Sequence, residues 1–131
     1  MNQDIIIADN LEQSLAEAIG KVEHDKLFVL TDTTTKELCW PVVQDYAAMK
    51  DACMITIPPT DEAKTLETLA DVWTALQKGG ATRHSLMVNL GGGMVTDLGG
   101  FAASTFKRGM AYINIPTTLL SMVDASVGGK T

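Results

Sequence analysis

Five glycines lie within ten residues of this chain, at positions 91, 92, 93, 99 and 100. The first three follow the apolar run 85–90, which has the length and composition of a buried strand, and they lead into a predicted helix. Glycine loses more backbone freedom on folding than any other residue, so its repeated use needs a reason. Bare amides at the positive end of a helix dipole bind anions well. The segment indicates nucleotide or phosphate binding, with a tight strand–helix turn as the simpler alternative.

Two well-known phosphate-binding motifs do not fit these glycines. G-x-G-x-x-G would need glycine at position 96, which is Thr96. The phosphate loop G-x-x-x-x-G-K-[ST] ending at Thr131 would need glycine at position 124, which is Asp124. A P-loop nucleoside triphosphatase is therefore not expected. Asp97 is predicted one turn inside the helix, where it either accepts hydrogen bonds from ligand hydroxyls or faces the helix dipole as a surface acid.

The elements that must position these residues alternate between strands and helices. Strands are predicted at residues 4–8, 26–32, 52–59, 85–90 and 111–116. Helices are predicted at residues 11–19, 42–49, 66–76, from the glycines to about residue 107, and at 117–126. Residues 33–35 are predicted as a turn and Asn10 as a helix cap. The pattern predicts one α/β domain over residues 1–131, a Rossmann-like, mostly parallel sheet with helices on both faces.

Composition and charge narrow the class of protein. The 131 residues suit one domain, and 46% hydrophobic with 20% charged residues is ordinary for a globular protein. A formal net charge of −6, with only 10 Lys and Arg, argues against nucleic acid or an anionic membrane as the partner. No run resembles a signal peptide or a membrane span, so a cytoplasmic location is expected. Cys39 and Cys53 are expected as buried or half-buried thiols, and His24 and His84 at the surface.

Two long stretches of the sequence resemble one protein family. GGGMVTDLGGFAASTFKRG and IPTTLLSMVDASVGGKT closely resemble the dehydroquinate synthase family, and the match runs without a gap from Gly91 to Thr131. Weaker matches lie upstream in register, at TDTTT and PPTDEAKTLETL. Proteins of this family are longer, with a second, largely helical domain that carries the metal ligands. The resemblance implies that the chain is the N-terminal, NAD-binding domain of such an enzyme without the C-terminal metal domain, and that the complete enzyme is a homodimer.

The resemblance assigns residues to cofactor binding. Gly92 and Gly93 would lie against the NAD pyrophosphate, and Asp97 would contact the nicotinamide ribose. The implied cofactor-binding set is Asp32, Asp61, Lys64, Gly92, Gly93, Asp97, Thr117, Thr118, Leu120 and Asp124. Asp61 stands where the family usually has Glu, so its side chain is one methylene shorter. Without the resemblance, Asp61 and Lys64 would be read as a solvated i,i+3 ion pair.

Three residues are implied in catalysis. Asp124 would approach the substrate hydroxyl or the metal region, and Lys130 would bind an anionic group of the substrate. Arg108 would cross the dimer interface to the substrate phosphate of the neighbouring subunit. Without the resemblance, Arg108 would be read as a cation that favours a helix C-terminus.

The implied reaction converts the small sugar phosphate 3-deoxy-D-arabino-heptulosonate 7-phosphate to 3-dehydroquinate and phosphate, a carbon–oxygen lyase reaction of the shikimate pathway. NAD removes and later returns a hydride, while zinc or another divalent metal polarises the substrate oxygen. Three other functions stay open: a sister sugar-phosphate cyclase, a polyol or iron-type alcohol dehydrogenase, and a non-catalytic nucleotide-binding module.

The chain is predicted to lack this activity by itself. The resemblance places the metal ligands in the second domain, and this sequence contains no pair of histidines with an acid at ligand spacing. Incubation of the 131-residue chain with the heptulosonate phosphate, NAD and zinc should release no dehydroquinate. Formation of dehydroquinate above the uncatalysed rate would contradict this prediction.

Overall fold

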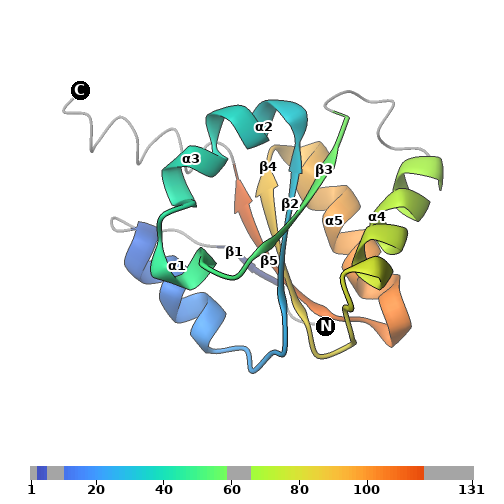
Figure 1. The fold of residues 1–131 in the computed structure, drawn as a ribbon, viewed down its shortest axis with the longest axis horizontal. Helices are drawn as coiled ribbons and strands as arrows, with labels where there is room; N and C mark the ends of the chain where they lie inside the picture. Colours follow the sequence, from blue (N-terminus) through green and yellow to red (C-terminus); the bar gives the residue numbers. More distant parts are fainter. Residues whose placement is uncertain (1–2, 6–10, 59–65, 117–131) are drawn as a thin grey trace.

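The computed structural model describes residues 3–5, 11–58 and 66–116. Within these ranges strands and helices alternate along the chain (Figure 1). The strands are β1 (Gln3–Ile5), β2 (Leu27–Asp32), β3 (Cys53–Ile57), β4 (Leu86–Gly91) and β5 (Ala111–Pro116). The helices are α1 (Leu11–Gly20), α2 (Thr33–Leu38), α3 (Trp40–Val43), α4 (Leu66–Lys78) and α5 (Gly93–Thr105), with short 3-10 helices η1 (Ala47–Met49) and η3 (Phe106–Arg108).

The five strands form one parallel sheet in the order β1-β5-β4-β2-β3. Strands β2 and β4 are buried along their whole length, as expected for continuous apolar runs that helices cover on both faces. Because parallel strands run the same way, their carboxyl ends meet at one edge. Gly91 at the end of β4 is in register there with Pro116 at the end of β5. The predicted parallel α/β fold is confirmed.

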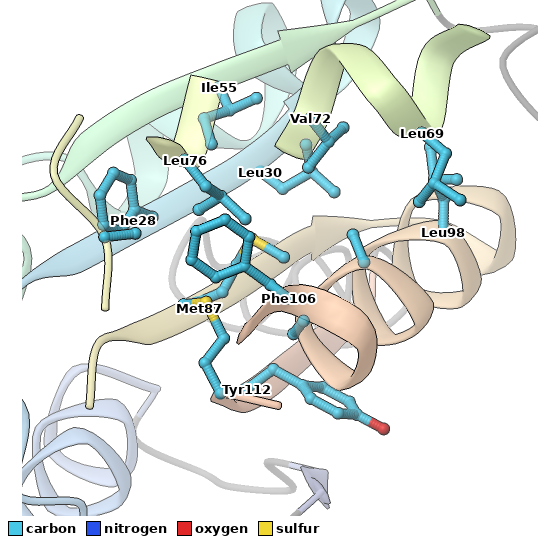
Figure 2. Packing of buried hydrophobic residues seen from close by; sticks show 14 of the residues in the cluster. Phe28, Leu30, Ile55, Leu69, Val72, Leu76, Met87, Leu98, Phe106 and Tyr112 are labelled. Atoms are coloured by element: carbon cyan, nitrogen blue, oxygen red, sulfur yellow. The ribbon is translucent and has the colours of Figure 1, made fainter. Parts of the chain in front are cut away.

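Helices cover both faces of this sheet (Figure 1). Helices α4 and α5 bury one face, where Leu76 and Ala102 pack with Met87 of β4. Figure 2 shows this cluster, in which side chains of both helices meet those of the central strands. Helices α1 and α3 bury the other face, where Leu15 and Val43 belong to a second cluster. The apolar stripes predicted for the helices thus become two separate cores, one on each side of the sheet.

The prediction of a turn at residues 33–35 is wrong, because these residues form the first turn of α2. The reason is a capping box formed with the end of β2. The Asp32 carboxylate accepts the Thr35 amide at 2.7 Å, and Thr35 Oγ1 accepts the Asp32 amide at 3.0 Å. This reciprocal pair outweighs the weak helix propensity of three consecutive threonines.

Other predicted elements are shorter than expected or lie outside the described residues. The helix predicted after Pro41 is limited to α3, which carries proline in its first turn, and the extended backbone of Tyr46 (φ −67, ψ 137) separates it from η1. Strand β1 accounts for part of the strand predicted at residues 4–8. The predicted cap at Asn10 and the helix at 117–126 fall outside the described residues.

The cysteines and histidines lie in different environments. Both cysteines are free thiols, but Cys53 is exposed at the start of β3, so the prediction of burial holds only for Cys39. Burial raises the pKa of the Cys39 thiol. His84 is exposed, as predicted, whereas His24 is half-buried, with Nδ1 2.6 Å from the carbonyl oxygen of Val22.

At the amino ends of the central strands, Asp25 joins the loop before β2 to the loop before β4. Its carboxylate accepts the Ser85 hydroxyl at 2.6 Å and the Thr82 hydroxyl at 2.5 Å. The Asp25 amide donates to the carbonyl of His84 at 3.2 Å. The two hydroxyl donors, Ser85 first, hold the pKa of Asp25 below its ordinary value of 3.8. This contact secures the edge of the sheet opposite the glycines.

Replacement of Asp25 by asparagine is expected to lower stability at neutral pH. Because folding lowers the pKa of this carboxyl, its contribution is complete above pH 3.8 and is lost as the pH falls through the lower folded value. The melting temperatures of wild type and Asp25→Asn should therefore differ at neutral pH and converge well below pH 3.8. Asp51→Asn, at an exposed acid in the turn before β3, is the matched control and should behave as wild type. Equal melting of wild type and Asp25→Asn at neutral pH would refute the role of Asp25.

Candidate functional site

The glycine turn (residues 91–93) connects β4 to α5 at the carboxyl edge of the sheet. Gly91 is buried, whereas Gly92 and Gly93 are exposed. Gly92 is the N-cap of α5 and provides no side-chain hydrogen bond to the helix. Thr96 donates its hydroxyl to the carbonyls of Gly92 and Gly93, at 3.3 and 3.1 Å, and so does not cap the amides. Within the described residues, the first amides of α5 are therefore accessible to an anion.

Glycine occupies positions 91 and 93 for different physical reasons. A Cβ at Gly91 would lie 2.9 Å from Cγ2 of Val95 and 3.3 Å from Cγ2 of Thr35, so packing requires glycine there. A Cβ at Gly93 would meet nothing within 4 Å. Gly93 is the first residue of α5, where glycine still loses more backbone freedom on folding than alanine, and the described residues around it give no packing reason for that loss. The bare backbone at Gly93 therefore suits a ligand that approaches it closely.

Asp32 lies beside the glycine turn, at the carboxyl end of the neighbouring strand β2. Its side chain is only 8% exposed, because one carboxylate oxygen, Oδ1, caps α2 through Thr35. Since the Thr35 methyl also contacts the position of Gly91, the first turn of α2 lies against the glycine turn. The Asp32 charge adds to burial in raising the pKa of Cys39. Asp32 is thus a structural cap at the candidate site.

Of the predicted site residues that the structure describes, three lie together and two lie apart from them. Asp32, Gly92 and Gly93 lie at the carboxyl edge, and Asp97 is exposed one turn along α5. Arg108 lies in η3, beyond the far end of α5, and 13 helical residues span about 20 Å. Its backbone is left-handed (φ 73), as is that of Lys107 (φ 45). Arg108 therefore does not join the glycine turn.

The remaining predicted residues are not described by the structure. Asp61, Lys64, Thr117, Thr118, Leu120, Asp124 and Lys130 all lie outside the described ranges. Strand β5 ends at Pro116, in register with Gly91, so the last described residue of β5 is at the same edge as the glycine turn. The roles of these seven residues stay predictions.

Sequence reasoning missed a buried amide pair beneath the glycine turn. Asn89 of β4 and Asn114 of β5 are in register, 0% and 6% exposed, and Asn89 Nδ2 donates to Asn114 Oδ1 at 3.0 Å. The Oδ1 atom of Asn89 has no hydrogen-bond partner among the described residues. An unpaired buried acceptor typically costs about 1–3 kcal/mol. The available signal was one amide residue in each of two apolar strands, in MVNLG and YINIP.

The described residues contain neither a cluster of metal ligands nor a helix that could span a membrane. Over residues 3–5, 11–58 and 66–116, no group of three or more His, Cys, Asp or Glu could hold a metal ion. None of the helices in that part of the chain is long and apolar enough to cross a membrane. The described residues therefore do not fit the divalent metal that the resemblance implies, and no chemical step is assigned to a metal here.

Comparison with known families identifies the family to which this chain belongs. Residues 54–131 match the family model described as 3-dehydroquinate synthase N-terminal. The chain belongs to the 3-dehydroquinate synthase family. It is 51% identical over 129 residues to 3-dehydroquinate synthase of Parabacteroides distasonis and 39% identical over 127 residues to that of Streptococcus pyogenes. These alignments cover 98% and 97% of this chain but only 36% of each relative.

Solved structures of sugar-converting cyclases have a similar fold. The chain is 32% identical to a 2-epi-5-epi-valiolone synthase of Streptomyces hygroscopicus solved with NAD+ and Zn2+, with a TM-score of 0.71 over 95% of this chain and 35% of that one. A 2-deoxy-scyllo-inosose synthase solved with carbaglucose-6-phosphate, NAD+ and Co2+ has a TM-score of 0.75 at 24% identity, over 89% of this chain and 32% of that one. The second similarity supports the fold alone. This member of the 3-dehydroquinate synthase family thus has the predicted α/β fold.

The cap at Asp32 can be tested by stability measurements in urea. Asp32→Ala removes the acceptor for the Thr35 amide and should cost about 1 kcal/mol of unfolding free energy. Asp32→Asn retains an acceptor oxygen and a good N-cap residue, so it should cost only a few tenths of a kcal/mol. If both variants unfold at the wild-type urea concentration, the capping box does not stabilise α2.

Proposed function

We propose that this chain is the NAD-binding N-terminal part of 3-dehydroquinate synthase. The complete enzyme would convert 3-deoxy-D-arabino-heptulosonate 7-phosphate to 3-dehydroquinate and phosphate with NAD recycled. Membership of the family and 51% identity to a 3-dehydroquinate synthase support this activity. Because the chain spans about a third of the relatives' length, the activity belongs to the complete enzyme, which we expect to be a cytoplasmic homodimer.

One observation supports the cofactor most directly: at the carboxyl edge of a parallel sheet, α5 begins with exposed glycine backbone and an N-cap glycine that offers no side-chain cap. Ligands of open α/β sheets bind beyond the carboxyl ends of the strands. The open space at Gly93 allows a pyrophosphate to contact the backbone without displacing a side chain. The residues present therefore fit a dinucleotide.

Each of the described residues that were predicted to bind the cofactor has a defined role in this proposal. The backbone at Gly92 and Gly93 binds the pyrophosphate, with the positive end of the α5 dipole behind it. Asp97, exposed on α5, accepts a hydrogen bond from the nicotinamide ribose. Asp32 uses Oδ1 for the cap, so its other oxygen is the one that reaches the adenosine ribose. Bound NAD supplies a hydride acceptor, and the protein backbone fixes its position.

A sister sugar-phosphate cyclase is the second candidate, favoured by 32% identity to the valiolone synthase. We rank it second because this identity is lower than the 51% identity to a 3-dehydroquinate synthase. Turnover of the complete enzyme with each sugar phosphate separates the two functions. Formation of 3-dehydroquinate supports the first, and turnover of a different heptulose phosphate alone supports the second.

Gly93→Ala is expected to change stability and NAD affinity in opposite directions. Alanine fits the open space at this helical position, so the unfolding free energy should rise by about 0.4–1 kcal/mol. The added methyl occupies the approach of the pyrophosphate, so the dissociation constant for NAD should rise about tenfold, which corresponds to about 1.4 kcal/mol. Calorimetric titration and urea unfolding of the 131-residue chain measure the two effects.

Gly20→Ala is the matched control for this experiment. Gly20 is the exposed last residue of α1, and a Cβ there also meets nothing within 4 Å. The control should not weaken NAD binding. Unchanged NAD affinity in Gly93→Ala would count against binding at the glycine turn, and absence of NAD binding by the complete enzyme would count against the proposed function.

A further inference from the structure

We propose that Asn89, packed against Gly99 and hydrogen-bonded to Asn114, positions the first turn of α5 and with it the backbone of the glycine turn. The inference rests on the proposed NAD binding, and it concerns two buried side chains beneath the glycine turn that would influence this binding indirectly. These side chains are buried within the protein and do not touch the cofactor themselves. They are positioning residues for the amides at Gly92 and Gly93.

The amide pair lies directly beneath the candidate site. Asn89 precedes Gly91 by two residues and Asn114 precedes Pro116 by two residues, and both pairs are in register on adjacent strands. Alternation along a strand places Asn89 on the same face as Met87, which belongs to the cluster under α4 and α5. The pair is therefore the last side-chain contact between β4 and β5 on the α5 face before the strands end.

Helix α5 rests on this amide without an intervening side chain. A Cβ at Gly99 would collide with Oδ1 and Cγ of Asn89 and would lie 2.8 Å from its Nδ2. A planar amide held edge to edge by its partner occupies less depth than a tetrahedral alkyl group. Gly99 follows Gly93 by six residues, about 9 Å along the helix axis. Since the helix moves as a rigid rod over this distance, its depth at Gly99 sets the position of its first turn.

Stability alone does not account for the pair. Asn89 Oδ1 has no partner in the described part of the chain, and replacing both members of a buried polar pair by apolar groups of similar shape is often neutral or stabilising. What the polar pair adds is direction, because the hydrogen bond from Asn89 to Asn114 fixes the plane of the amide on which α5 rests. Departures from optimal packing are expected where function requires them.

The double variant Asn89→Leu/Asn114→Leu tests the inference in the 131-residue chain. Leucine has the same branching as asparagine but is not planar, so α5 should be displaced outward. We expect the amide resonances of Gly92 and Gly93 to shift without any ligand and the NAD dissociation constant to rise about tenfold. Removal of the unpaired Asn89 Oδ1 offsets the loss of packing at Gly99, so the melting temperature should change little. A structural role alone would instead lower melting temperature and affinity together.

Thr31→Val/Thr56→Val is the matched control. These threonines form another cross-strand polar contact, with hydroxyl oxygens 3.4 Å apart between β2 and β3, and valine has the same shape. The control should leave the resonances of Gly92 and Gly93 and the NAD affinity unchanged. An equal effect of both double variants would overturn the inference.

The possible failures are distinguishable. If the leucine variant keeps wild-type resonances at Gly92 and Gly93, the positioning role is wrong, and NAD binding by wild type still stands. If its melting temperature and affinity fall together, the pair is structural and the inference is also wrong. If the complete enzyme does not bind NAD, the proposed function fails, while the ligand-free resonances of the 131-residue chain still decide whether Asn89 and Asn114 position the turn.

Discussion

The close packing of α5 on the carboxyl half of β4 is the constraint on which the candidate site depends. Contact is made through Gly91 at the end of β4 and Gly99 in α5, because a side chain at Gly91 would collide with Val95 and one at Gly99 would collide with Asn89. The helix therefore begins directly above the strand end, and its first amides project beyond the sheet. A looser packing would separate these amides from the neighbouring ends of β2 and β5.

The amino and carboxyl edges of the sheet differ in how their polar groups are paired. At the amino edge, the Asp25 carboxylate accepts two hydroxyls and the Asp25 amide donates to a backbone carbonyl. These hydrogen bonds join the loops before two central strands. At the carboxyl edge, the side chain of Asp32 caps α2, whereas the N-cap residue of α5 is Gly92, which has no side chain to cap the helix. Backbone groups left without a side-chain partner lower stability and make an anion site available. The proposed NAD site of this member of the 3-dehydroquinate synthase family therefore lies at the edge where α5 begins with glycine.

The glycines of the turn also show why residue type alone does not reveal a role. Gly91 is required by its neighbours, whereas Gly93 has open space and costs helix stability. Both positions read identically in the sequence. The three-dimensional surroundings separate a glycine needed for packing from one that suits a ligand.

Local patterns in the sequence were sufficient to predict the alternation of strands and helices, the parallel sheet, the place of the glycine turn and the family. These features depend on periodicity and residue order within single elements, which the sequence records directly. The helix at 33–35 rests on a local capping box between Asp32 and Thr35, a pattern that the sequence contains but that the prediction overlooked. The exposure of Cys53 and the amide pair were decided by tertiary structure, because each depends on which elements become neighbours. Asn89 and Asn114 are 25 residues apart and meet only because β4 and β5 pair in register, a contact that no local pattern specifies.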